Sequence, residues 1–434
     1  MTGNNQPLVS VIMPYYNGRR FVREAIQSIL SQTYPNIEII VVDDASPDRE
    51  DSEFIEKLAD ELGFRLIKHL TNKGIGQTMA DAFEASNGDF IAELSQDDLY
   101  KPEKIERQIN ELTNNKLDAV YAAGDILYQN SAKVEKRDIS KTKKIIESGA
   151  AAEALKFQNL PSISIQGLLA KRSVFEKDIV PIWREYMLDD WPVNIRLFER
   201  YKVGFIESPL WTGRSHTQHT SKNIWKWLGP QIEVVARMSP EHLKVEAIGN
   251  RLASMARRLQ KQNGDRQDII RLAFAGLMLT ESPDQHRKAV RVLCKTPLED
   301  RKTIVNSKKK LLEAVACPAQ EKRTPERTEL VGWENLGKDI SNVVSTYESR
   351  ERLHEIGKLF FSLANNILLE NQLLSNAVKA ALAALMLIDN LRIERQIVDT
   401  LRSVSEKDKG RLIKAKCRSL KVNIRMTVKS LFSK

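Results

Sequence analysis

The stretch VSVIMPYYNGRRFVREAIQSILSQTYPNIEIIVVDDASPD, residues 9–48, decides the fold class. It holds two short runs rich in β-branched residues, 9–14 and 37–44, and an amphipathic stretch between them at 21–32. Short, almost continuously apolar runs indicate strands that are covered on both faces, and the amphipathic stretch indicates a helix. The stretch therefore predicts a strand–helix–strand unit, which is the building block of a parallel sheet.

The same alternation continues as far as residue 123. It predicts further strands and helices, which we expect at 64–69, 89–94 and 118–123 for strands and at 52–62, 76–88 and 101–112 for helices. This order predicts an α/β fold with a Rossmann-like, mostly parallel sheet and helices on both faces. In such sheets ligands bind beyond the carboxyl ends of the strands. The polar residues at those ends are the site candidates: Tyr15 to Asn17, Asp43 with Asp44, and Asp97 with Asp98.

Beyond residue 124 the pattern is less regular. The charged segment 131–149 is expected to be a loop, and a helix that begins near Asp189 and precedes a strand is expected within 187–208. From about Pro240 onward the pattern is helix after helix, with a break near 317–331. We therefore expect three parts: an α/β domain at 1–235, an all-α region at 236–408, and a basic amphipathic helix at 409–434.

Asp97 and Asp98 directly follow a probable buried strand, and two adjacent carboxylates there repel each other. One interpretation is structural, because an aspartate near the start of a helix accepts backbone N–H bonds as a cap. The other is a divalent cation such as Mg²⁺ or Mn²⁺, which prefers carboxylate oxygens and in turn binds a diphosphate. The pair alone leaves both interpretations open.

The order of several motifs resembles one family. The opening stretch, TNKGIGQTMADAFEASNGDFIAELSQDDLYKPEKIERQ at 71–108, MLDDWPVNIRLFERY at 187–201 and GRSHTQHTS at 213–221 resemble the family 2 glycosyltransferases, which have the GT-A fold. The resemblance spans roughly residues 8 to 222, about half of the chain. Several ordered motifs are more specific than any one of them.

The resemblance implies a role for each matching residue. It places Pro14, Tyr15, Asn17, Asp44 and Asp97 against the nucleotide, Asp98 and His216 at the metal, and Asp190 as the general base. Trp183, Asp189 and Trp191 flank the base and are assigned to the acceptor, with core packing as the alternative for the two rings and helix capping for the acid pair. Met79 and Ala80 stand where many members carry an Arg–Asn pair, so a diphosphate contact is missing from the pattern.

These residue types suit the chemistry of glycosyl transfer. A divalent cation stabilises a diphosphate leaving group without a proton, and a carboxylate on the opposite face of the sugar takes the proton of the acceptor hydroxyl. A single displacement inverts the anomeric centre. We therefore expect an inverting, metal-dependent transferase that uses a nucleotide-sugar, with UDP as the expected nucleotide, and acts on a saccharide acceptor, including a lipid-linked one of a cell-surface polysaccharide.

The net charge of +10 is concentrated at one end of the chain. Residues 409–434 carry nine Lys and Arg and no acid, and an apolar stripe runs from Ile413 to Leu431 at helical spacing. A basic amphipathic helix of this type is drawn to anionic lipid, although docking on the helical region is the alternative. No basic leader, spanning helix, metal-like cysteine spacing or nucleic-acid module is recognised, so we expect a cytoplasmic protein peripheral at the membrane.

Two other functions fit parts of the pattern. A sugar-1-phosphate nucleotidyltransferase shares the fold class, but a glycine-rich signature is expected at its first strand, where PYYNGRR stands at 14–20. A degenerate transferase domain that presents the helical half as a binding or scaffold module is the non-enzymatic alternative. The helical half shows no chemistry of its own, and its expected roles are to form a homo-oligomer, to hold the acceptor or to scaffold a partner.

Overall fold

The structure is a computed structural model that describes residues 6–156, 163–216, 223–281, 283–315, 331–370 and 374–404. The chain divides into two compact units, Met1–Thr220 and Ser221–Lys434, and each is described by itself. The domain boundaries expected at 235/236 and 408/409 stay predictions. The basic segment 409–434 lies outside the described residues.

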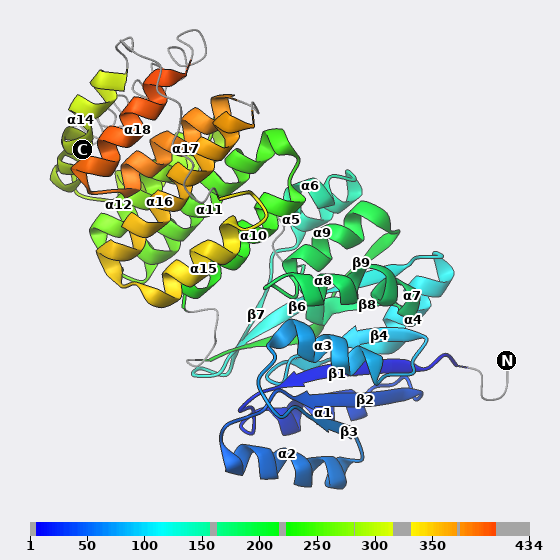
Figure 1. Cartoon of the computed structure of the whole chain (residues 1–434). Helices are drawn as coiled ribbons and strands as arrows, with labels where there is room; N and C mark the ends of the chain where they lie inside the picture. Colours follow the sequence, from blue (N-terminus) through cyan, green and yellow to red (C-terminus); the bar gives the residue numbers. More distant parts are fainter. Residues whose placement is uncertain are drawn as a thin grey trace. The chain divides into compact units, whose positions relative to one another are not determined.

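The first unit is built on one mixed sheet (Figure 1). Within the described residues it has nine strands, of which eight follow the order β3-β2-β1-β4-β8-β6-β9-β5, with β7 paired to β6. The strands are β1 Val9–Tyr15, β2 Ile37–Asp43, β3 Arg65–Lys68, β4 Phe90–Glu93, β5 Leu99–Tyr100, β6 Ala119–Tyr128, β7 Lys133–Lys136, β8 Leu168–Lys171 and β9 Val203–Ser215. The five strands expected from the sequence correspond to β1, β2, β3, β4 and β6.

Four neighbouring strands, β3, β2, β1 and β4, are parallel to one another. Tyr15 at the end of β1 lies beside Asp43 at the end of β2, and Ile12 of β1 lies beside Glu93 at the end of β4. The carboxyl ends of these strands therefore meet at one edge, as the sequence predicted. Figure 1 shows the four strands side by side at the blue end of the chain.

Helices cover both faces of this sheet, as expected. One apolar core packs β1, β2 and β4 against α1, α2 and α4, and a second core packs the opposite face against α3, α8 and α9. The helices of this unit are α1 Val22–Leu30, α2 Arg49–Leu62, α3 Ile75–Glu84, α4 Lys104–Asn114, α5 Ser140–Glu147, α6 Ala151–Lys156, α7 Arg172–Val174, α8 Val180–Glu185 and α9 Trp191–Arg200. The sheet and its two helical layers confirm the α/β class.

Two features differ from the sequence-based expectation. Strand β8 enters between β4 and β6 and is antiparallel to both, so the parallel series does not run on to β6. The segment 131–149, expected to be a loop, contains β7 and α5. All four residues of β7 are exposed, so the strand is held by pairing with β6 and shows no apolar alternation for a sequence pattern to detect.

The described part of the second unit is helical, as expected beyond Pro240. Its helices are α10 Leu228–Met238, α11 Glu241–Lys261, α12 Arg266–Leu279, α13 Pro283–Cys294, α14 Leu298–Val315, α15 Leu336–Thr346, α16 Ser349–Leu369, α17 Leu374–Leu387 and α18 Leu391–Ser403. None of the helices in the described part of the chain combines the length and the apolar character of a membrane-spanning segment.

Helices α10 and α15 approach each other closely at Gly229 of α10 and Gly337 of α15. A Cβ at Gly337 would lie 2.3 Å from Cβ and 2.5 Å from Cα of the fully buried Glu233. Backbone atoms cannot yield as a flexible side chain does, so the two helices can pack only with glycine there.

We expect Gly337→Ala to lower the free energy of unfolding of the helical unit by about 1–3 kcal/mol, the usual cost of overpacking. Chemical denaturation followed by circular dichroism measures this. Ser345→Ala, at an exposed position of the same helix, is the control and should change little. Equal stability of Gly337→Ala and the parent chain would contradict this account of the α10–α15 contact.

Candidate active site

The loop that follows β1 forms one part of the sheet edge. Pro14 lies within β1. The Tyr15 side chain is only 1 % exposed, and its hydroxyl donates a hydrogen bond to Asp51 of α2. Tyr16 is 44 % exposed, and Asn17 has a left-handed backbone with φ of 48°. The predicted Tyr15 ring therefore packs beneath the loop, and Tyr16 is the exposed aromatic residue.

The end of β2 supports this loop. The carboxylate of Asp43 accepts hydrogen bonds from the N–H and the hydroxyl of Ser46, and the Ser46 hydroxyl oxygen accepts a 2.9 Å bond from the N–H of Asn17. Ala45 lies between them with φ of 58°, a conformation that non-glycine residues adopt at a cost. Strained backbone at this position is consistent with a functional loop.

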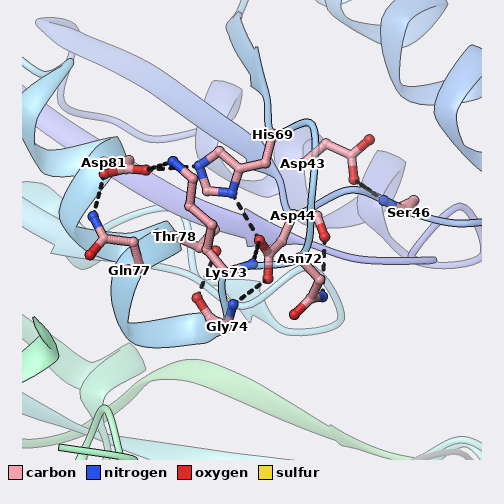
Figure 2. A network of polar contacts seen from close by, with 10 residues as sticks. All are labelled: Asp43, Asp44, Ser46, His69, Asn72, Lys73, Gly74, Gln77, Thr78 and Asp81. Carbon is pink, nitrogen blue, oxygen red and sulfur yellow. Dashed lines mark hydrogen bonds and ion pairs between the residues drawn. The ribbon is translucent and has the colours of Figure 1, made fainter.

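Asp44 is the centre of a buried polar network (Figure 2). One of its carboxylate oxygens accepts the N–H of Lys73 at 2.8 Å and lies 2.8 Å from Nδ1 of His69, and the other accepts the N–H of Gly74 at 2.9 Å. Burial alone would raise the pKa of Asp44, but these hydrogen bonds outweigh burial and lower that pKa. Asp44, which was predicted to contact the nucleotide, is thus a charged group that also fixes the turn before α3.

His69 connects Asp44 to a second acid. Its Nε2 lies 2.9 Å from Asp81 Oδ2, and the same oxygen accepts a 2.8 Å ion-pair bond from Lys73 Nζ (Figure 2). Nothing in the sequence motifs pointed to His69 or Asp81. Met79, where the resemblance expects arginine, is fully buried and uncharged, and Lys73 is a cation that contacts this network through Asp81.

The Asp97–Asp98 turn is attached to the end of β9. The Arg214 backbone N–H donates to Asp98 Oδ1 at 2.8 Å, and its Nε donates to the carbonyl oxygen of Asp97 at 2.9 Å. Nε2 of His216 lies 2.9 Å from Asp97 Oδ2. The structure therefore brings His216 to the Asp97–Asp98 turn, although His216 is 119 positions away from Asp97 in the chain.

Asp98 is poorly suited to carrying a charge without a ligand. Burial, followed by the charge of Asp97, raises the pKa of Asp98 to about 7, against the opposing effect of the Arg214 N–H. A bound cation would reverse this effect by favouring the ionised form.

Asp189 and Asp190 precede α9 on the other side of the edge. Asp190 is the N-cap of that helix and accepts the Trp191 N–H, so the capping role is present in the structure. Burial, reinforced by the charge of Asp190, raises the pKa of Asp189 to about 7, and burial also raises the pKa of Asp190. A partly buried aspartate with a raised pKa is a better proton acceptor than an exposed one.

The two tryptophans assigned to the acceptor lie in the core. Trp183 is 2 % exposed and donates its indole N–H to the carbonyl of Asp189, and Trp191 is 5 % exposed and donates to the carbonyl of Leu155. Rings buried to this degree have no open face for a sugar. This burial favours core packing, the alternative that the sequence left open, and the acceptor role of the two rings stays a prediction.

Glu93 lies within electrostatic reach of both acid pairs at this edge, Asp97–Asp98 through Asp98 and Asp189–Asp190. It is the last residue of β4, it is buried, and neither carboxylate oxygen has a hydrogen-bond partner among the described residues. Burial and then the charges of Asp189, Asp190 and Asp98 raise the pKa of Glu93 well above its usual range. The visible signal in the sequence was a lone acid within the apolar run FIAEL at 90–94.

The donor set suits a divalent cation, but only together with a ligand. Among the described residues no three His, Cys, Asp or Glu side chains converge closely enough to hold a metal by themselves. Mg²⁺ and similar ions are commonly held by one or two carboxylates, with phosphate oxygens and waters completing the shell. The uncompensated acids at this edge fit such a cation, with Asp97 and Asp98 as the carboxylates that would hold it.

The fold and the edge together define a class: an α/β domain with an acidic ligand site at the carboxyl ends of parallel strands. Comparison with known proteins agrees. Residues 10–178 match the model of "Glycosyl transferase family 2". Over these residues the first unit is similar to glycosyltransferase family 2, as the motifs indicated, and it has the mixed sheet expected for the GT-A fold.

Curated relatives carry related descriptions. An uncharacterized glycosyltransferase of Rickettsia felis is 33 % identical over 225 residues, which is 50 % of this chain and 36 % of that protein. The Escherichia coli protein WfgD, named a UDP-Glc:α-D-GlcNAc-diphosphoundecaprenol β-1,3-glucosyltransferase, is 37 % identical over 127 residues, 29 % of this chain and 48 % of WfgD. The matches thus cover less than half the length of these relatives.

Among solved structures, Staphylococcus aureus TarS 1–349 in complex with UDP is similar at 15 % identity, with a TM-score of 0.44, covering 74 % of this chain and 97 % of the other.

We expect the unpartnered Glu93 carboxyl to make stability pH-dependent. The folded chain holds its proton at pH values at which the unfolded chain has lost it, so the stability associated with this group is present below the ordinary glutamate range and is lost as pH rises. The melting temperature of Glu93→Gln relative to the parent should therefore increase between about pH 5 and about pH 8.

Glu38→Gln is the matched control with the opposite sign. Burial opposes it, but hydrogen bonds from Ser10 and Asn87 lower the pKa of Glu38, so this group stabilises the fold above the ordinary glutamate range. Its variant should lose stability relative to the parent as pH rises. A Glu93→Gln curve parallel to that of the parent at all pH values would refute the assignment.

Proposed function

We propose that the first unit is an inverting glycosyltransferase that moves a sugar from a nucleotide-sugar to a hydroxyl group of a saccharide acceptor. The match to the family model supports this class of reaction. The observation that carries the proposal is that Glu93, buried at the end of β4 and without a hydrogen-bond partner among the described residues, lies within electrostatic reach of Asp98, Asp189 and Asp190. A phosphate-binding half and a proton-accepting half thus share one edge.

In the proposed reaction, Asp190 takes the proton of the acceptor hydroxyl. The acceptor oxygen forms a bond to the anomeric carbon as the bond from that carbon to the diphosphate breaks on the opposite face, so the configuration inverts. A divalent cation bound beside Asp97 and Asp98 would neutralise the charge of the departing diphosphate. The loop of Tyr16 and Asn17, with Asp44 beneath it, holds the nucleotide end.

The donor and acceptor classes are part of the proposal. WfgD is named for a UDP-sugar donor and a diphosphoundecaprenol-linked acceptor, and its similarity to this chain supports UDP and a lipid-linked saccharide as the first choices to test. The proposed setting is the synthesis of a cell-surface polysaccharide. A screen of nucleotide-sugars for Mn²⁺-dependent stabilisation, followed by UDP-release assays on lipid-linked acceptors, tests both choices.

We expect Asp190→Asn to lower transfer at least 10²-fold, because the amide cannot accept the proton but keeps the shape of the side chain and can still cap α9. Mn²⁺-dependent UDP binding, measured by calorimetry, should remain near the parent value. Asp118→Asn, at a part-buried acid paired with Lys171, is the control for a general loss of an aspartate. Full transferase activity in Asp190→Asn would reject its role as the base.

The converse pattern separates the metal role from the base role. We expect Asp98→Ala to lose Mn²⁺-dependent UDP binding, because the carboxylate that balances the cation is gone. If UDP bound Asp98→Ala and the parent equally well in Mn²⁺, the metal assignment would be wrong.

We also propose that residues 409–434 attach the chain to an anionic membrane surface. Nine Lys and Arg without an acid support an electrostatic attraction to anionic lipid, and the apolar stripe supports shallow insertion. A lipid-linked acceptor would then lie at the same surface as the enzyme.

We expect the full chain to float with vesicles that contain anionic lipid, and a chain that ends at Gly410 to bind them at least tenfold more weakly. Neutral vesicles and high salt should reduce binding of the full chain, since screening removes the electrostatic part. Equal flotation of the two chains would exclude the tail as the anchor.

A further inference from the structure

One side chain joins the nucleotide loop to the acidic turn. Gln96 precedes Asp97, and its side-chain amide makes two hydrogen bonds to the backbone of Tyr16. The Tyr16 N–H donates to Gln96 Oε1 at 2.8 Å, and Gln96 Nε2 donates to the Tyr16 carbonyl oxygen at 3.0 Å. The amide thus acts as a short bridge between the segments that follow β1 and β4.

The loop is shaped around this amide. A Cβ at Gly18 would lie 2.3 Å from Gln96 Oε1 and 2.4 Å from its Cδ, so a larger residue at this position would have to displace the Gln96 amide. From the other side, Ser46 at the end of β2 holds the N–H of Asn17. The loop is therefore fixed by residues from both neighbouring strand ends.

The turn that carries Gln96 is itself fixed where a diphosphate would bind. Asp97 contacts His216 through its carboxylate, and Arg214 bonds both the Asp97 carbonyl oxygen and the Asp98 carboxylate. Gln96 is one residue away from these contacts. A change in this turn on ligand binding would therefore be transmitted directly to Tyr16.

We propose that Gln96 is a positioning residue that couples the nucleotide loop to the cation-binding turn. This inference rests on the proposed function, because it concerns how the same donor is held. When a cation and a diphosphate order the turn, the Gln96 amide orders Tyr16 and Asn17 against the nucleoside. Binding at the two ends of the donor then becomes cooperative, and the coupling is reciprocal.

The test measures UDP dissociation constants by calorimetry on the full chain, once with Mn²⁺ and once with EDTA. Gln96→Met keeps the length of the side chain and its packing against Gly18 but removes both hydrogen bonds. In Mn²⁺ we expect affinity for UDP to fall about tenfold, the size expected for one or two lost hydrogen bonds. In EDTA we expect a smaller change in affinity. The ratio of the dissociation constant in EDTA to that in Mn²⁺ should therefore fall toward one.

Gln32→Met is the matched control. Gln32 also spans two backbone groups with its amide, since Nε2 donates to the Lys101 carbonyl oxygen at 2.7 Å and Oε1 accepts the Ile105 N–H at 3.0 Å. Gln32→Met should lose about as much stability as Gln96→Met, but the ratio of its two UDP dissociation constants should stay at the parent value. In steady-state transfer assays Gln96→Met should raise KM for the donor and leave kcat within about twofold.

Three outcomes would overturn the inference. If both dissociation constants rose by the same factor, so that their ratio stayed at the parent value, Gln96 would be a local support only. If neither constant changed, or if amide hydrogen exchange at Tyr16 were as slow in Gln96→Met as in the parent, the bridge would not hold the loop. A parent chain that bound no UDP would reject the proposed function and this inference together, whereas a parent that bound UDP without coupling would reject the inference alone.

Discussion

The geometry of the site depends on Arg214, whose side chain is almost fully buried. One residue donates to Asp98, to the Asp97 carbonyl oxygen and to Glu24 of α1, and so fastens the end of β9 to the acidic turn and to the first helix. The pairing with the exposed Glu24 adds little by itself. The bonds to the turn matter more, because they fix two carboxylates at the sheet edge despite their repulsion. Because Arg214 is two residues before His216, the same bonds also hold His216 close to Asp97.

The acids at this edge fall into two groups that differ in their donors. Asp43 and Asp44 are satisfied by hydroxyl, amide and imidazole groups of the protein, and these hydrogen bonds lower the pKa of Asp44. Glu93 and Asp98 receive little or no such support, and burial raises the pKa of each. A buried polar group without a partner is costly, and native structures keep few of them. Asp43 and Asp44 therefore hold the loops of the site in place. For Glu93 and Asp98, the proposed ligand would supply the compensating charge.

The sequence predicted the parts of this arrangement that follow from local pattern. The apolar runs and helical spacings located β1 to β4 and α1 to α4 within a few residues, and the acids at the strand ends followed from the parallel order. It could not predict β8, because antiparallel insertion between β4 and β6 depends on pairing partners far apart in the chain. Arg214, His69 and Gln96 were missed for the same reason: each acts through a contact across the fold. The burial of Trp183 and Trp191 could not be predicted either, because residue type alone does not tell whether a ring packs in the core or meets a sugar.

The helical unit contains a buried acid that is paired within the protein. There the buried Glu394 is paired with the buried Lys308, which also donates to the carbonyl oxygen of Ile388. Such pairs satisfy both charges within the protein, and breaking one would leave an uncompensated charge. The chain therefore has the means to neutralise a buried carboxylate where the fold requires it. Within the part of the chain that the structure describes, Glu93 at the end of β4 has no hydrogen-bond partner, and the charges that act on it come from Asp189, Asp190 and Asp98. This difference supports the proposal that the edge, rather than the helical unit, binds a ligand that supplies the compensating charge.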